Sequence, residues 1–299
     1  MARKALKIKE EIPQLYEVKP VKTKPYNDID LNHWKDYDHI DTGTLWMYQS
    51  RAKGNGHSFD YHGNYIPQIA QQLYERYTKK GDVVLDMFLG SGTSAIEALN
   101  MQRRCIGIEL NPNVVEYTSS KFSQKDLCTD IRIINGDSAS EEIREKIQTN
   151  LELMTEKKAQ FVVLHPPYDD IIKFSDNEKD LSNCKSTQEF YDLFEKVAKT
   201  AYDFLEKKRF AALIIGDKYA NGELIPLGFK CMEAMNHAGF TTKSIIIKNI
   251  EGNEKAKGKL QTSGDTEHSQ AVSISSNMNI LWYSRKDNYF FSLNLNLNK

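Results

Sequence analysis

The sequence predicts an α/β fold: a doubly wound, mostly parallel Rossmann-like sheet that ends in an antiparallel hairpin. Three observations support this prediction. Short aliphatic runs alternate with helical stretches, a glycine-rich turn joins one such run to a helix, and two apolar runs near the end of the chain flank a short polar turn. Strands are expected at 83–87, 104–108, 131–134, 161–164, 211–215 and 243–249. Helices are expected at 66–77, 94–101, 112–121, 140–149, 187–206 and 228–237.

Local signals mark where several of these elements begin and end. In the helix at 66–77, apolar residues recur at helical spacing along one face, and Pro67 lies in the first turn, where proline is tolerated. Gly239 follows the helix at 228–237, as a C-cap residue should. The terminal hairpin would pair Ile280–Tyr283 with Tyr289–Leu293.

Two domains are predicted from a change of pattern along the chain. Residues 1–56 are polar, rich in lysine and short of periodic pattern, and we expect an N-terminal arm that is either a solvated tail or a segment that contacts an anionic partner. Residues 57–299 would form the main domain, in which 251–277 is an inserted loop of polar residues. Lysines concentrate in 1–25 and again in 248–260, although the whole chain has a net charge of −1.

Composition excludes several classes of protein. No apolar run approaches the roughly 20 residues that span a bilayer, and the first residues lack the apolar core of a signal peptide. The cysteines are scattered without the spacing of a zinc site, so neither a metal nor a disulfide framework is expected. We therefore expect a cytoplasmic protein without a metal.

The most informative motif is the turn that follows the strand at 83–87. Asp86 ends the aliphatic run, Phe88 follows, and Gly90-Ser91-Gly92 leads into a helix at Thr93. In open α/β sheets this is where nucleotide-like ligands bind, because glycine lets backbone N–H groups approach the ligand closely. The next strand ends in Glu109, whose carboxylate can accept hydrogen bonds from two ribose hydroxyls. The Gly-x-Gly-x-x-Gly spacing of nicotinamide enzymes is absent.

A third motif, Pro166-Pro167-Tyr168, follows the strand at 161–164, with His165 before it. Together, the motifs resemble those of the amino-group DNA methyltransferases that use S-adenosylmethionine. The resemblance covers roughly residues 57–295, and it implies that S-adenosylmethionine is the cofactor. By this resemblance the cofactor-binding residues are Asp86, Phe88, Gly90, Ser91, Gly92, Thr93, Glu109 and Asp137. Asp137 is at the position that accepts a hydrogen bond from the amine of the cofactor's adenine.

The resemblance also makes His165, Pro166, Pro167 and Tyr168 the catalytic residues. In the family, the first side chain and the first proline carbonyl accept hydrogens of an exocyclic amine, while the aromatic ring stacks on a base flipped out of the duplex. The family has Asp, Asn or Ser where this chain has His165. A neutral imidazole can accept one hydrogen bond, but an imidazolium cannot. We therefore expect activity to fall sharply below about pH 6.

The expected function is site-specific methylation of double-stranded DNA, with N6-adenine favoured over N4-cytosine. Only the arm and the 251–277 loop are left to read a sequence, so either they read a short site or a second subunit supplies the specificity, in a homodimer or as a separate specificity subunit. A cognate restriction enzyme is a further candidate partner. The alternatives are a catalytically silent or partner-dependent methylase subunit, to which the unusual His165 points, and an RNA methyltransferase, because a fold alone does not determine the substrate.

Overall fold

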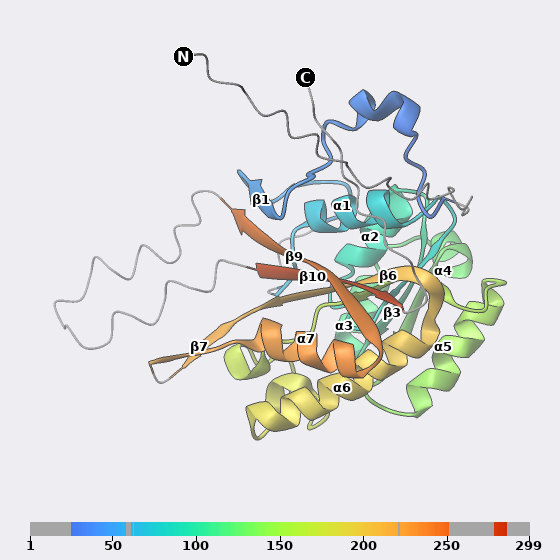
Figure 1. Ribbon diagram of the computed structural model, residues 1–299. Coiled ribbons are helices and arrows are strands. Elements are labelled where there is room, and N and C mark those ends of the chain that lie inside the picture. Colours follow the sequence, from blue (N-terminus) through green and yellow to red (C-terminus); the bar gives the residue numbers. More distant parts are fainter. Residues whose placement is uncertain (1–24, 58–60, 62, 221, 251–277, 286–299) are drawn as a thin grey trace, which may run out of the picture.

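The structure is a computed structural model of the chain, and it describes residues 25–57, 61, 63–220, 222–250 and 278–285. Helices cover both faces of one large sheet (Figure 1). The strands are β1 Leu45–Tyr48, β2 Val83–Asp86, β3 Arg104–Glu109, β4 Ile131–Asn135, β5 Ala159–Leu164, β6 Leu205–Gly216, β7 Lys218–Ala220, β8 Glu223–Ile225, β9 Phe240–Ile250 and β10 Met278–Arg285. The α-helices are α1 Pro67–Tyr77, α2 Thr93–Asn100, α3 Pro112–Ser119, α4 Gln124–Thr129, α5 Glu142–Leu153, α6 Thr187–Phe204 and α7 Leu227–His237. These elements confirm the predicted α/β fold class.

The sheet has the order β1-β9-β10-β6-β5-β2-β3-β4. The pairs from β4 to β6 are parallel, whereas β10 runs antiparallel to both of its neighbours, β6 and β9. The predicted hairpin is not confirmed, because 289–293 lies outside the described residues. What the structure shows instead is that β10, the last strand of the described residues, lies between two earlier strands.

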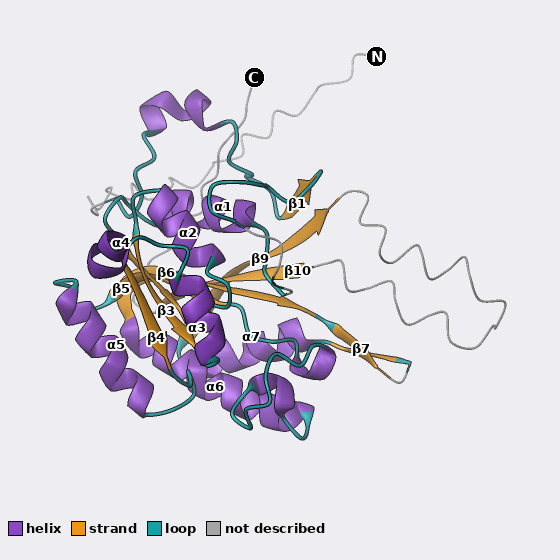
Figure 2. Cartoon of the chain, turned by 180° about the vertical axis from the view of Figure 1, so that it is seen from behind, coloured by secondary structure: helices purple, strands orange, loops and turns teal. Residues whose placement is uncertain are grey.

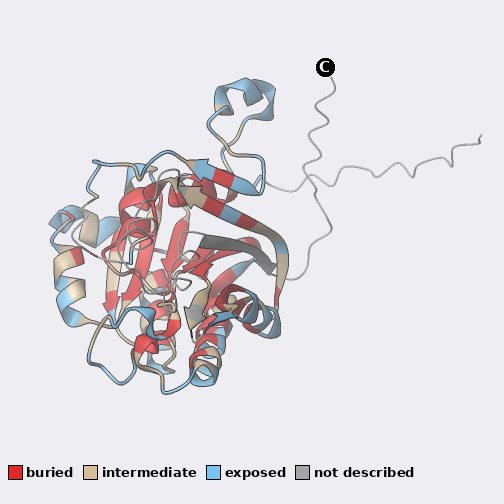
Figure 3. Cartoon of the chain, turned by 90° about the vertical axis from the view of Figure 1, so that its left-hand side faces the viewer, coloured by how far each residue is buried: buried red, intermediate tan, exposed pale blue. Residues whose placement is uncertain are grey.

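Two hydrophobic clusters fill the space between the sheet and the helices. One lies under α5, α6 and α7, and the other lies under α1 and α2 on the opposite face (Figure 2). Buried residues follow the central strands and the helix surfaces that face them (Figure 3). Both faces of these strands are covered, which explains why they appear in the sequence as continuous aliphatic runs.

The strand β1 was not predicted, and it pairs in parallel with β9 at the edge of the sheet. Its Trp46 is completely buried in the cluster under α1, and the indole N–H donates to the Gly43 carbonyl oxygen at 3.1 Å. Residues 45–48 are thus part of the sheet. Residues 1–24 of the predicted arm and the whole predicted loop at 251–277 lie outside the described residues. The division of the chain at residue 56 stays a prediction.

Candidate active site

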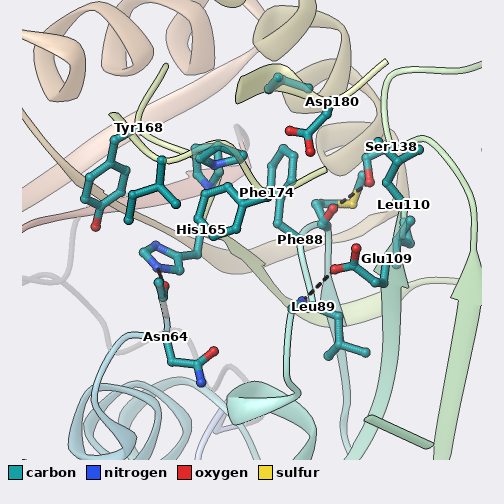
Figure 4. Close-up of a pocket in the computed structure, with 18 of the residues that line it drawn as sticks. Asn64, Phe88, Leu89, Glu109, Leu110, Ser138, His165, Tyr168, Phe174 and Asp180 are labelled. Carbon is teal, nitrogen blue, oxygen red and sulfur yellow. Dashed lines mark hydrogen bonds between the residues drawn. The ribbon is translucent and has the colours of Figure 1, made fainter. Parts of the chain in front are cut away.

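A cavity of about 230 Å³ lies at the carboxyl ends of β2, β3, β4 and β5. It brings together residues from all three sequence motifs, since each motif follows the end of a different parallel strand (Figure 4). The predicted site residues that line it are Phe88, Gly90, Thr93, Glu109, Asp137, His165, Pro166, Pro167 and Tyr168.

The other predicted residues are Asp86, Ser91 and Gly92, which belong to the Gly90–Gly92 turn or precede it and do not line the cavity. The Asp86 carboxylate is buried and accepts from the Phe88 N–H at 2.8 Å, and burial raises its pKa to about 6. The Ser91 hydroxyl accepts from the Asn64 side-chain amide at 2.5 Å, which ties the turn to the segment before α1. Asp86, Ser91 and Gly92 therefore shape the turn.

Gly92 is required by both its backbone conformation and its surroundings. It precedes α2 in the left-handed region, with φ 86°, and a Cβ there would lie 2.7 Å from Cγ2 of Thr118. Thr118 cannot easily move aside, because its side chain is buried and its hydroxyl donates to the Gly90 carbonyl oxygen at 2.9 Å. The sequence motif thus carries a steric requirement as well as a conformational one.

Replacing Gly92 by alanine is expected to lower the free energy of unfolding by about 2–4 kcal/mol, from the left-handed conformation and from the clash with Thr118. Gly81→Ala is the matched control, because Gly81 has φ 83° but no heavy atom within 4 Å of the new Cβ. We expect this control to lose only about 1–2 kcal/mol. Urea unfolding of both variants measures the difference, and equal losses would show that the Thr118 contact costs nothing.

Glu109 is held so that its carboxylate faces the cavity. One oxygen accepts from the Gly90 N–H at 3.0 Å (Figure 4). The other oxygen accepts from the Asn111 N–H at 2.8 Å. Burial raises the pKa of this carboxyl, while the two N–H donors act in the opposite direction. Each oxygen still has a lone pair for a further hydrogen bond. The geometry suits a vicinal diol such as that of a ribose.

His165 makes contacts that the sequence did not predict. Its Nδ1 lies 2.8 Å from the Ile214 carbonyl oxygen in β6, and its Nε2 lies 2.9 Å from the Gly63 carbonyl oxygen. A neutral imidazole carries one N–H, so it can donate to only one of these two acceptors. Burial lowers the pKa of the ring, so the neutral form is favoured at pH 7. One nitrogen lone pair therefore faces a carbonyl oxygen, which is an unfavourable contact.

Tyr168 packs edge-to-face against His165, with the ring centroids 5.6 Å apart. Its ring also lies against the backbone of Gly216 at the end of β6, where any Cβ would come within 3.0 Å of the ring. The ring is partly exposed and lines the cavity. It is thus held at the cavity wall by two neighbours.

Asp137 lies in the cavity wall just after β4, at the end away from Tyr168 and His165. Its carboxylate accepts from the Ala139 N–H at 2.8 Å, which fixes the turn that leads toward α5. The predicted role in binding the adenine amine stays a prediction.

Several residues that line the cavity were not singled out from the sequence. Tyr61 and Phe174 stack with ring centroids 6.4 Å apart, and Asp180 is buried where its carboxylate accepts from the hydroxyls of Ser175 and Ser182. Asn64 and Tyr65, just before α1, line the cavity as well. Asp180 lies in a polar stretch without periodic pattern, and no sequence signal identified it.

The described residues hold no cluster of three or more histidine, cysteine or acidic side chains that could bind a metal ion. No helix of the described residues is long and apolar enough to cross a membrane.

Parts of the chain are similar to known DNA methyltransferases. A family model described as DNA methylase matches residues 4–120. Among curated proteins, the type II methyltransferase M.BglI of Bacillus subtilis is 36% identical over 75 residues, which are 25% of this chain and 20% of that protein. The type II methyltransferase M.Cfr9I of Citrobacter freundii is 43% identical over 83 residues, which are 28% of this chain and 26% of that protein. The matched segments thus span about a quarter of these relatives or less.

The chain is also similar in fold to a solved structure, the TehB-like SAM-dependent methyltransferase from Corynebacterium glutamicum. The TM-score is 0.41 and the identity is 13%, over 69% of this chain and 82% of that one.

Proposed function

We infer from the DNA methylase match and the type II relatives that the chain belongs to the DNA amino-methyltransferase family, with S-adenosylmethionine as cofactor. We propose that it methylates an exocyclic amine of a base flipped out of double-stranded DNA, with N6-adenine favoured over N4-cytosine. One observation carries the proposal: the cavity connects the Glu109 carboxylate and the Gly90 turn at one end to Pro166-Pro167-Tyr168 at the other.

The residues of the cavity fit the cofactor at the first of these ends. Glu109 would accept from both ribose hydroxyls, Phe88 would pack nearby, and the backbone around Gly90 would hold the methionine portion. When bound there, S-adenosylmethionine supplies an activated methyl group on a sulfonium. No described side chain has to form a covalent bond, so the protein contributes mainly positioning and electrostatic stabilisation.

At the second end, Tyr168 would stack on the flipped base while the Pro166 carbonyl accepts one hydrogen of its amine. The amine is a poor nucleophile because its lone pair is delocalised into the ring. Holding its hydrogens by two acceptors favours a tetrahedral nitrogen and frees that lone pair. His165 would be the second acceptor after its unprotonated nitrogen leaves the facing carbonyl oxygen, a contact that is already unfavourable.

A second candidate function is a methylase subunit that is silent without a partner. The contacts of His165 favour it, because both ring nitrogens lie against main-chain oxygens and neither is free to accept from a base. A homodimer, a separate specificity subunit or a cognate restriction enzyme would be the partner in this case.

The test is transfer of labelled methyl from S-adenosylmethionine to unmethylated bacterial DNA, followed by digestion to nucleosides. Label in N6-methyladenine or N4-methylcytosine would support the enzyme and identify the base. Cofactor binding without label in DNA would favour the silent subunit or an RNA substrate. Absence of cofactor binding would contradict the proposal that the chain is a methyltransferase.

The pH dependence of transfer tests the role of His165. Burial lowers the pKa of the ring from its ordinary value of 6.5, so the ring is neutral at pH 7 and gains a proton only as the pH falls through that lower pKa. The imidazolium cannot accept from the amine, and kcat should fall ~tenfold per pH unit below the pKa. The measurement needs saturating cofactor, because burial raises the pKa of Glu109 and its protonation at low pH would weaken cofactor binding.

The control is His165→Asn, which keeps an acceptor that does not titrate. It should remain active and lose the acid limb of the kcat profile. If kcat of this variant falls at low pH as kcat of the wild type does, a group other than His165 is responsible for the fall.

A further inference from the structure

Lys248, near the end of β9, is a largely buried lysine. Its side chain belongs to a residue that is only 6% exposed, and no carboxylate of the described residues lies within ion-pair distance of its ammonium. Burial is the main cause that lowers the pKa of this ammonium, and the charge of Arg51 lowers it further. The ammonium is not among the fully buried polar atoms that lack a partner, so it reaches solvent at the end of a buried aliphatic stem.

Lys248 lies beside the base end of the candidate site. Strand pairing places Trp46, Lys248, Met278 and Gly216 in one row across β1, β9, β10 and β6. Gly216 is the residue against which Tyr168 packs. Adjacent strands are about 4.8 Å apart, so the Lys248 backbone lies roughly 10 Å from that of Gly216. The ammonium is also near enough to His165 to lower its pKa.

Arg51 brings a second cation to the same place. Its guanidinium donates to the Asn64 carbonyl oxygen at 3.0 Å, and the adjacent Gly63 carbonyl oxygen faces His165. The segment 63–64 thus lies between Arg51 and His165, and it lines the cavity. Lys248 and Arg51 thus lie behind the wall of the cavity that is proposed to receive a base, and two neighbouring cations attract an anion.

We propose that Lys248 and Arg51 form a phosphate-binding subsite for the DNA backbone at the flipped nucleotide. This inference rests on the proposed function. A base stacked on Tyr168 leaves its flanking phosphates outside the cavity, and the ammonium of Lys248 is the charge that would meet one of them. Neutralising this phosphate would position the nucleotide without reading its sequence.

The test compares Lys248→Met with Lys243→Met, which removes an exposed lysine from the same strand. The probe is a fluorescent unmethylated duplex with a mismatched central adenine, because a mismatched base is easier to extrude. Anisotropy across a salt series in the presence of S-adenosylhomocysteine gives the affinity and its salt dependence. Lys248→Met should weaken binding about tenfold and reduce the slope of log K against log salt by about 0.9, the value for one phosphate contact. Lys243→Met should bind like the wild type.

Two further readouts separate this role from a structural one. Thermal unfolding of Lys248→Met should occur at or above the wild-type temperature, because methionine keeps the buried apolar stem and a partly desolvated charge is removed. Its affinity for S-adenosylmethionine should be unchanged. An unchanged salt slope would overturn the inference, and so would a loss of cofactor affinity alone, which would assign the ammonium to the cofactor carboxylate. If the wild type methylates DNA but its salt slope equals that of Lys248→Met, only the phosphate-binding subsite is refuted. If the wild type binds no DNA, the proposed function is refuted as well.

Discussion

Glu109→Ala is expected to lower the affinity for S-adenosylmethionine roughly a hundredfold or more. The substitution removes both acceptors proposed for the ribose hydroxyls, and a hydrogen bond to a charged group contributes about 1.5–3 kcal/mol. Titration calorimetry with the cofactor measures the loss directly. Glu109→Gln, which keeps one acceptor oxygen and nearly the same volume, should fall between the wild type and the alanine variant.

The carboxylate of Glu109 also accepts from the N–H groups of Gly90 and Asn111, so the variants need a check on folding. Circular dichroism and thermal unfolding provide it. A folded Glu109→Ala protein that binds the cofactor as tightly as the wild type would refute the ribose role.

Tyr168→Ala should reduce methyl transfer to DNA about ten- to a hundredfold and leave cofactor affinity nearly unchanged. Stacking of one base on an aromatic ring is worth about 1–3 kcal/mol, and the ring is held in place by His165 and Gly216. The rate of labelled methyl transfer at limiting DNA is the measurement.

Tyr168→Phe is the matched control because it keeps the ring, and it should transfer methyl groups close to the wild-type rate. If the phenylalanine variant were as impaired as the alanine variant, the hydroxyl would be the important group. If both were fully active, Tyr168 would not stack on the base.

The parts of the fold that could be predicted are those specified by nearby residues. The parallel strands are buried on both faces and appear as aliphatic runs, and the turn at Gly90–Gly92 needs residues without side chains. In contrast, β1 is a strand of four residues that depends on β9 for its hydrogen bonds, and the sequence of Leu45–Tyr48 does not contain that dependence.

The candidate site was predictable to the same extent. Residues that follow parallel strands were expected to meet at one edge of the sheet, and Glu109 and Tyr168 do line one cavity. The partners of His165 were not predictable, because Ile214 and Gly63 are 49 and 102 residues away in the sequence. Backbone carbonyls carry no residue-specific signal, so only the folded chain reveals that they surround the imidazole.

The position of β10 has a consequence for synthesis of the protein on the ribosome. Because β10 lies between β6 and β9, the edges of these two strands that face β10 stay unpaired until residues 278–285 have emerged from the exit tunnel. Until then the nascent chain exposes unpaired strand edges on which aggregation can begin. We expect translation arrest before residue 278 to leave a chain that needs a chaperone, although every motif of the candidate site has already been synthesised.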